Sequence, residues 1–387
     1  MTKELIEKII RFSVVGVMFL ALFVIQGISD DREANLIVFM LAMISLFSLI
    51  IGNIWVTLFI LLTVFLFSFF KFQGGIYLSN IFFGSVLYYI TKISFKREHT
   101  GLFIEGFLWF VLANLVYMVI QVSGLDFIFS KIHVIDGFEM LEPNLKPTGF
   151  MGHLSITAAL LAMSIPVLAS RGSKWSWAGA LLLFFPLYLC KTSLCFVMGL
   201  AGLLFILYFK IPKRIWTALI VVMLLCGLFY IQKVDKPGFE RLTQWKRVMK
   251  DYMIHPITGW GLDSFRNFTP QKDFVYQSTL TDYSVGIDSN GRIFKNVKFI
   301  TYWDNPHNLI ISLLSEWGFF GLFFFICYNI QNIKLFIKAI KYPDVIGLAG
   351  FLFVFLGVSM GHFPIFLARL AVCIIPAAAL FEIAIRK

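Results

Sequence analysis

Long apolar runs separated by short polar connections are the feature of this sequence that most constrains its fold. A helix needs about 20 apolar residues to cross the hydrocarbon layer of a membrane, and runs of this kind recur along the whole chain. Overall, 59% of the residues are hydrophobic and 14% are charged, whereas soluble domains average roughly 45–50% and 25%. The pattern excludes a water-soluble enzyme. It predicts an all-α polytopic membrane protein in which residues 1–387 form one integral membrane domain.

The runs predict about twelve transmembrane helices. Several neighbouring runs are separated by only a few residues, as Gly52 and Asn53 separate the second from the third. Twelve spans place both chain ends on the same side of the membrane. The predicted spans are 9–26, 35–51, 54–70, 76–93, 102–122, 152–170, 177–190, 193–209, 214–231, 309–331, 345–361 and 364–384.

Basic residues indicate which side of the membrane holds the chain ends, because cytoplasmic connections are enriched in Lys and Arg. With the N-terminus inside, the inside connections carry clusters such as Lys92, Lys96 and Arg97, and the short outside connections carry few basic residues. Both termini are therefore predicted to be cytoplasmic. The net charge of +11 follows this distribution. We attribute it to topology and to contact with membrane lipids, and expect no nucleic-acid partner.

Two outside connections are long, residues 123–151 and residues 232–308, and the second lies between the ninth and tenth predicted spans. A loop of this length in a compact protein is usually functional. The second loop also holds a large share of the polar residues of the chain. We therefore expect the chemistry to take place at the outer membrane face.

An amphipathic helix is predicted near the start of the second loop. Within residues 239–252, apolar residues that include Trp245 recur at steps of three and four, as on one face of a helix. The other face carries basic residues, among them Arg241 and Lys246. Two interpretations remain open. Either the charges lie among lipid headgroups, or Arg241 turns inward and pairs bidentately with a diphosphate.

The end of the same loop places His307 at the outer membrane surface, directly before the tenth predicted span. Either Asn305 or Asn308 is suited to cap that helix. A histidine in this position is either a structural residue or a general base, since a neutral imidazole can accept a proton near pH 7.

The order of the short motifs in this loop resembles the O-antigen ligase family, whose wider superfamily includes O-antigen ligases, some O-antigen polymerases and bacterial O-linked oligosaccharyltransferases. The pattern is R-x3-W, then P-x2-G-x-G-x3-F, then H-N-x7-E-x-G-x2-G entering a span. The residues that carry it are Arg241, Trp245, Pro256, Gly259, Gly261, Phe265, His307, Asn308, Glu316, Gly318 and Gly321. Each motif is short, and the specificity comes from the ordered set in the largest loop.

Two further segments resemble the family less closely. Residues 149–154 open the sixth predicted span, where relatives often have Asn in place of His153. His153 either lines the site or is a hydrogen-bonded residue of the interface. Lys191 opens the eighth span, where many relatives carry a Ser-Arg pair. It either replaces that arginine as a phosphate ligand or extends its ammonium group to the membrane surface.

The resemblance implies a glycosyltransferase of the GT-C type in the bacterial inner membrane, with its large loop in the periplasm. The implied donor is a glycan on undecaprenyl diphosphate, and the implied acceptor is a hydroxyl group, with lipid A–core favoured. Arg241 then holds the diphosphate with help from Lys191, and His307 is the general base. One direct displacement inverts the anomeric carbon. The further substrate-binding residues are predicted to be His153, Trp245, Asn308 and Glu316.

Neither a cofactor nor a metal ion is predicted. The loops contain no Asp-x-Asp pair, which is one familiar divalent-metal motif of sugar transfer, and metal-independent transfer fits the family. The five cysteines include no Cys-x-x-Cys pair, and this disfavours a zinc site or a disulfide framework.

Other functions share parts of this pattern. A polysaccharide polymerase or a protein O-oligosaccharyltransferase would use the same donor chemistry with a different acceptor. A polysaccharide transporter is the alternative from a different functional class, and it predicts polar residues and helix breaks near the middle of the membrane. The polar residues of this sequence gather at the outer face instead.

Overall fold

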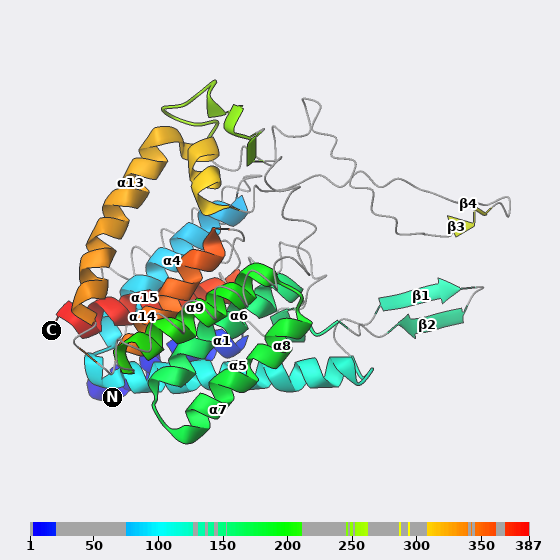
Figure 1. Ribbon diagram of the computed structural model, residues 1–387, viewed down its shortest axis with the longest axis horizontal. Helices are drawn as coiled ribbons and strands as arrows, with labels where there is room; N and C mark the ends of the chain where they lie inside the picture. Colours follow the sequence, from blue (N-terminus) through cyan, green and yellow to red (C-terminus); the bar gives the residue numbers. More distant parts are fainter. Residues whose placement is uncertain are drawn as a thin grey trace. The chain divides into compact units, whose positions relative to one another are not determined.

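Helices account for most of the chain that the computed structural model describes (Figure 1). The described residues are 3–20, 75–126, 131–135, 138–142, 146–151, 153–210, 245–246, 248–250, 252–261, 286–287, 293–294, 308–339, 342, 345–360 and 368–386. They confirm the predicted helical class. The runs predicted at 35–51, 54–70 and 214–231 lie outside them, so the total of twelve spans stays a prediction.

The described helices fall on the remaining predicted runs, with shifts at their ends. They are α1 (Lys3–Leu20), α4 (Gly75–Ser94), α5 (Thr100–Val122), α6 (Leu154–Ser170), α7 (Lys174–Leu182), α8 (Phe184–Leu189), α9 (Ser193–Lys210), α13 (Leu309–Ala339), α14 (Ile346–Ser359) and α15 (Ala368–Arg386), with the short 3-10 helices η1 (Arg97–His99) and η2 (Gly149–Met151). The run predicted at 177–190 is divided between α7 and α8, which meet at Leu183.

Two short antiparallel hairpins lie within the predicted long loops. They are β1 (Lys131–Ile135) with β2 (Phe138–Glu142), and β3 (Gly286–Ile287) with β4 (Ile293–Phe294). In the first hairpin, Lys131 is paired with Glu142 and Ile135 with Phe138. Neither hairpin was predicted from the sequence, and they add two short two-stranded sheets to a structure that is otherwise helical. A search for membrane-spanning runs passes over such hairpins, although the Asp136-Gly137 pair between two short runs is a sequence signal for the first one.

The chain forms two compact units. One unit comprises residues 1–236 and 328–387, and the other comprises residues 237–327. Within the first unit, α6, α9 and α14 pack against one another, and α4 packs against α15 (Figure 1). The predicted division into one membrane domain with outer loops at 123–151 and 232–308 stays a prediction.

Small residues allow the helices of the first unit to approach closely. A Cβ built on Gly202 of α9 would lie 3.3 Å from the ring of Pro166 in α6. A Cβ on Gly350 of α14 would lie 2.6 Å from the same proline. Helix interfaces in membranes are enriched in such residues, because packing there depends on close contact and lipid tails are as apolar as large side chains.

The described helices also carry apolar surface of the kind that faces lipid. On α5, the exposed side chains Trp109, Leu112, Val116 and Val119 follow one another at steps of three and four, so they lie on one face. A continuous exposed apolar face of this kind is rare on soluble monomers. Among the described residues, two helical segments are long and apolar enough to cross a membrane, Arg97–Val122 and Leu309–Cys327.

Candidate functional site

The residues predicted for the site are divided between the two units and the part of the chain that is not described. Their places are His153 and Lys191 in the first unit, Trp245, Asn308 and Glu316 in the second, and Arg241 and His307 outside the described residues. The catalytic roles assigned to Arg241 and His307 therefore stay predictions.

In the second unit, Asn308 caps the start of α13. Its side-chain Oδ1 accepts a hydrogen bond from the backbone N–H of Ile311 at 3.1 Å, which is the N-cap geometry expected from the sequence. The Asn308 side chain is buried. Because His307 directly precedes this residue, the cap determines where the helix begins after the proposed general base.

Helix α13 is interrupted at Gly318, the glycine of the E-x-G motif. This residue has φ 65° and ψ −156°, which are not helical angles. A Cβ on Gly318 would lie 2.3 Å from the carbonyl oxygen of Ile257. An L side chain is excluded both by the positive φ and by the lack of space, so the backbone itself requires glycine here.

Residues 256–261 lie against this interruption and are joined to it through the main chain. Four backbone N–H groups connect the two segments by hydrogen bonds of 2.8–3.4 Å. The donor and acceptor pairs are Trp260 to Ser315, Gly261 to Glu316, Phe319 to Pro256 and Phe320 to Ile257. The P-x2-G-x-G and E-x-G motifs, which lie far apart in the sequence, therefore form one structure, called the loop–helix joint below.

Glu316 contributes to this joint through its carbonyl group, and its side chain is buried, with 7% exposed. A buried carboxylate is costly unless it has partners, so Glu316 is suited to a fixed position and not to a solvated one. The substrate contact predicted for this carboxylate stays a prediction.

The helical residues at 245–246 and 248–250 have the amphipathic character that the sequence predicts. Trp245, Met249 and Tyr252 are partly buried, and Lys246 and Lys250 are exposed. This confirms which face of the segment is covered. The substrate contact predicted for Trp245 stays a prediction.

In the first unit, His153 caps the start of α6. Its Nδ1 accepts a hydrogen bond from the backbone N–H of Ser155 at 3.2 Å. The geometry fits the interpretation of His153 as a hydrogen-bonded residue of the interface. Its predicted contact with substrate stays a prediction.

Lys191 follows the C-terminal end of α8, and its backbone has a left-handed conformation. Its φ is 51°, and its backbone N–H donates to the carbonyl of Tyr188 at 3.0 Å, as at the end of many helices. Glycine is the usual residue in such a position, and another residue there costs about 1–3 kcal/mol. The side chain is exposed, so both interpretations of its ammonium group stay open.

The turns that carry His153 and Lys191 meet in the first unit. Cys190, which precedes Lys191, donates a hydrogen bond from Sγ to the carbonyl of Pro147 at 3.8 Å. Pro147 begins the turn that leads to His153 through η2. The structure thus joins the turn that precedes α6 to the end of α8, which the sequence places on separate spans.

A buried polar network that sequence reasoning missed holds the same turn. Gln121 Nε2 donates to Asp126 and to Thr148 at 3.0 Å each, and its Oε1 accepts from the backbone N–H of Gly149 at 2.6 Å. Tyr117 donates its hydroxyl to Asp126 at 2.5 Å. Asp126 is 2% exposed, so these donors replace its lost hydration. The signal in the sequence is the four-residue spacing of Tyr117 and Gln121, which puts both on one helix face.

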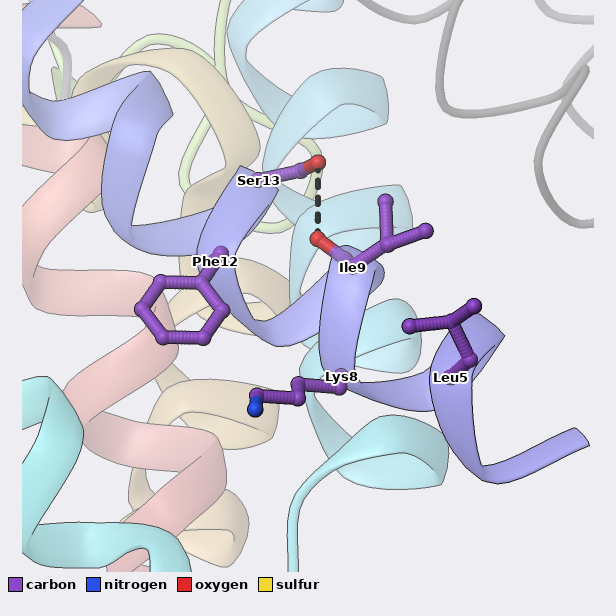
Figure 2. A pocket seen from close by; sticks show the side chains of 5 residues that line it. All are labelled: Leu5, Lys8, Ile9, Phe12 and Ser13. Atoms are coloured by element: carbon purple, nitrogen blue, oxygen red, sulfur yellow. Dashed lines mark hydrogen bonds between the residues drawn. The ribbon is translucent and has the colours of Figure 1, made fainter.

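Other parts of the described structure offer less for catalysis. A hollow along α1 is lined by Leu5, Lys8, Ile9, Phe12 and Ser13 (Figure 2). The hydroxyl of Ser13 donates to the carbonyl of Ile9 at 2.9 Å, and Lys8 is the one ionisable group among these five residues. Within the described ranges, no group of three or more His, Cys, Asp or Glu is placed to hold a metal ion.

Comparison with known proteins gives one family match. The model of the family described as O-Antigen ligase matches residues 156–326, from α6 to a point in α13 beyond Gly318. No curated protein matches the chain. The match confirms the resemblance that the motifs indicate. Of the predicted site residues it includes Lys191, Arg241, Trp245, His307, Asn308 and Glu316, and it begins just after His153.

Proposed function

We propose that this chain, which belongs through residues 156–326 to the O-antigen ligase family, moves a glycan from undecaprenyl diphosphate to an acceptor hydroxyl. It is an integral membrane protein with an O-antigen ligase-like or polymerase-like function, a glycosyltransferase-like enzyme that acts on glycan and lipid substrates. In our proposal, the reaction takes place at the periplasmic face of the bacterial inner membrane, and the acceptor is lipid A–core.

One observation carries the proposal, namely that the segments following the two proposed catalytic residues are joined. Residues 256–261 follow Arg241 in the chain, and residues 315–320 follow His307. Four main-chain hydrogen bonds connect these segments. This supports a single site built from both ends of the 232–308 loop, as a reaction that needs both residues requires.

The proposed reaction is a single displacement. The acceptor oxygen attacks the anomeric carbon, the bond from that carbon to the diphosphate oxygen breaks, and the configuration inverts. Arg241, assisted by Lys191, stabilises the charge that grows on the leaving diphosphate. His307 takes the proton of the acceptor hydroxyl. The step balances without a metal ion, because the guanidinium and the ammonium supply the positive charge.

The acceptor can be identified by reconstitution. We expect purified protein to transfer glycan from undecaprenyl diphosphate to core lipopolysaccharide, and to leave a second glycan-lipid and a pilin-like peptide unmodified. Mass spectrometry of each acceptor measures the product, and the His307→Ala variant is the matched control. Product on the glycan-lipid alone would make the protein a polymerase, and product on the peptide a protein-modifying enzyme. Movement of glycan-lipid across vesicles without any product would favour a transporter.

The proposed topology makes a separate prediction. A cysteine introduced between 270 and 300 should react with an impermeant thiol reagent added outside the inner membrane, whereas cysteines at 96–97 or 336–341 should react only after permeabilisation. The background needs a cysteine-free chain, because Cys327 is exposed in the structure. Labelling with the opposite sidedness would place the large loop in the cytoplasm and remove the periplasmic site.

A further inference from the structure

We infer that the loop–helix joint between residues 256–261 and residues 315–320 is a positioning device, and that Gly259 and Gly318 are its positioning residues. The loop–helix joint exists whatever reaction the protein catalyses, whereas the effect of the joint on catalysis rests on the proposed function. The hydrogen bonds of the joint replace those that the break in α13 removes.

The interruption of α13 releases four main-chain groups. In an uninterrupted helix, the N–H of Phe319 would donate to the carbonyl of Ser315, and the N–H of Phe320 to that of Glu316. The non-helical angles of Gly318 separate these partners. The loop supplies a replacement for each released group. The replacements are the carbonyls of Pro256 and Ile257 and the N–H groups of Trp260 and Gly261.

Because each of these four groups has a new partner, the interrupted helix can exist at a membrane. Main-chain groups without partners are strongly unfavourable in hydrocarbon, and breaks in membrane helices persist only where the released groups are satisfied by other parts of the protein. If the loop moved away, all four groups would lose their partners together. The joint is therefore expected to be either fully formed or fully open.

Two glycines make the close approach of the backbones possible. Gly259 has φ 67° and Gly318 has φ 65°. A Cβ on Gly259 would lie 2.5 Å from the carbonyl carbon of Glu316, and a Cβ on Gly318 would lie 2.3 Å from the carbonyl oxygen of Ile257. The obstructing atoms are backbone on both sides, so no side-chain rotation can make room. The two glycines thus serve one joint.

The N–H groups that bond within the joint are occupied by protein carbonyls and are not available to a ligand. Half-helix ends at breaks in membrane helices commonly point at bound substrates or ions. Here the N–H groups of Phe319 and Phe320, which begin the second part of α13, donate to Pro256 and Ile257. The contribution of the joint to the reaction is geometric.

The joint connects the two ends of the proposed site. On one side, the hydroxyl of Tyr252 donates to the carbonyl of Pro256 at 2.8 Å, and Tyr252 follows the helical residues that carry Trp245. On the other side, the first part of α13 runs back from Ser315 to the Asn308 cap. Opening the joint would change the position of both ends.

The test combines hydrogen exchange with kinetics on the full chain in detergent or nanodiscs. The variants are Gly259→Ala, Gly318→Ala and the double variant, with Gly101→Ala as control, because a Cβ on Gly101 in α5 meets nothing within 4 Å. Each single variant should release the amides of Trp260 and Gly261 together, whereas those of Phe319 and Phe320 can regain Ser315 and Glu316 as partners in a continuous helix. Each should lower kcat by about 100-fold, as a displacement near 1 Å can, with a KM for the donor within about threefold of the wild type. The double variant should cost little more than either single one, because the joint is already open.

A milder variant keeps the positioning role testable if the glycine variants do not accumulate in the membrane. Tyr252→Phe removes one hydrogen bond to the joint from a partly exposed side chain, and it should lower kcat about fivefold with normal protein levels.

Rapid hydrogen exchange at the four amides in the wild type would show that the joint does not form. Released amides with unchanged kcat would overturn its positioning role. A wild type with protected amides that transfers glycan to no acceptor would overturn the proposed function, and the catalytic consequence with it, while the joint itself stands.

Discussion

Arg241→Ala is expected to lower glycan transfer by roughly 10–150-fold for each charge-assisted contact that is lost, with the protein still present in the membrane. The leaving diphosphate gains negative charge as its bond to the sugar breaks, and a guanidinium pairs with two phosphate oxygens at once. Arg241→Lys should recover little, because an ammonium group cannot make that paired contact. The measurement is initial transfer rate from undecaprenyl-diphosphate glycan, normalised to the amount of protein in the membrane.

A matched control for Arg241 lies on the same predicted helix. Lys246 is exposed, so Lys246→Ala removes one positive charge from the segment and should leave the rate near that of the wild type. Full activity in the Arg241→Lys variant, or an equal loss in Lys246→Ala, would reduce the role of Arg241 to electrostatic attraction at the membrane surface.

His307→Ala is expected to lower turnover by about 10²–10⁴-fold, the usual contribution of a general base, while binding of the donor is retained. His307→Gln keeps a hydrogen-bonding group but cannot take a proton, so it should be nearly as inactive. A general base works in its neutral form, so activity should fall as the pH drops and the histidine becomes protonated. The measurement is the pH profile of kcat, with donor affinity determined separately.

The structure sharpens the control for this second prediction. A competing hypothesis gives His307 only the task of capping α13, but that task falls to Asn308, whose Oδ1 accepts the N–H of Ile311 at 3.1 Å. Asn308→Ala should destabilise the helix start by about 1 kcal/mol and keep the fall in activity at acid pH. If His307→Gln retained most activity and the same acid-side fall, the assignment of His307 as general base would be withdrawn.

Features that depend on neighbouring residues could be predicted from the sequence. The runs at 76–93, 102–122 and 193–209 correspond to α4, α5 and α9, because an apolar segment of this kind satisfies its own backbone groups only as a helix. The cap at Asn308 is equally local, since the residue type and its place before an apolar run are enough to suggest it. The family resemblance could also be read from the sequence, because it depends on the order and spacing of short motifs from the large loop into the tenth predicted span.

The tertiary structure decided what joins these local pieces. The run at 309–331 contains Ser315, Glu316 and Gly318, but its average hydropathy is still that of one membrane-spanning helix and does not mark the interruption at Gly318. That break depends on partners from 256–261, and the network of Gln121 depends on Thr148 in the same way. Hydropathy and capping act between residues close in the chain, whereas a hydrogen bond between distant segments forms only once the fold has brought their backbones within reach. The sequence shows which glycines and polar residues are present, and the fold determines which of them meet.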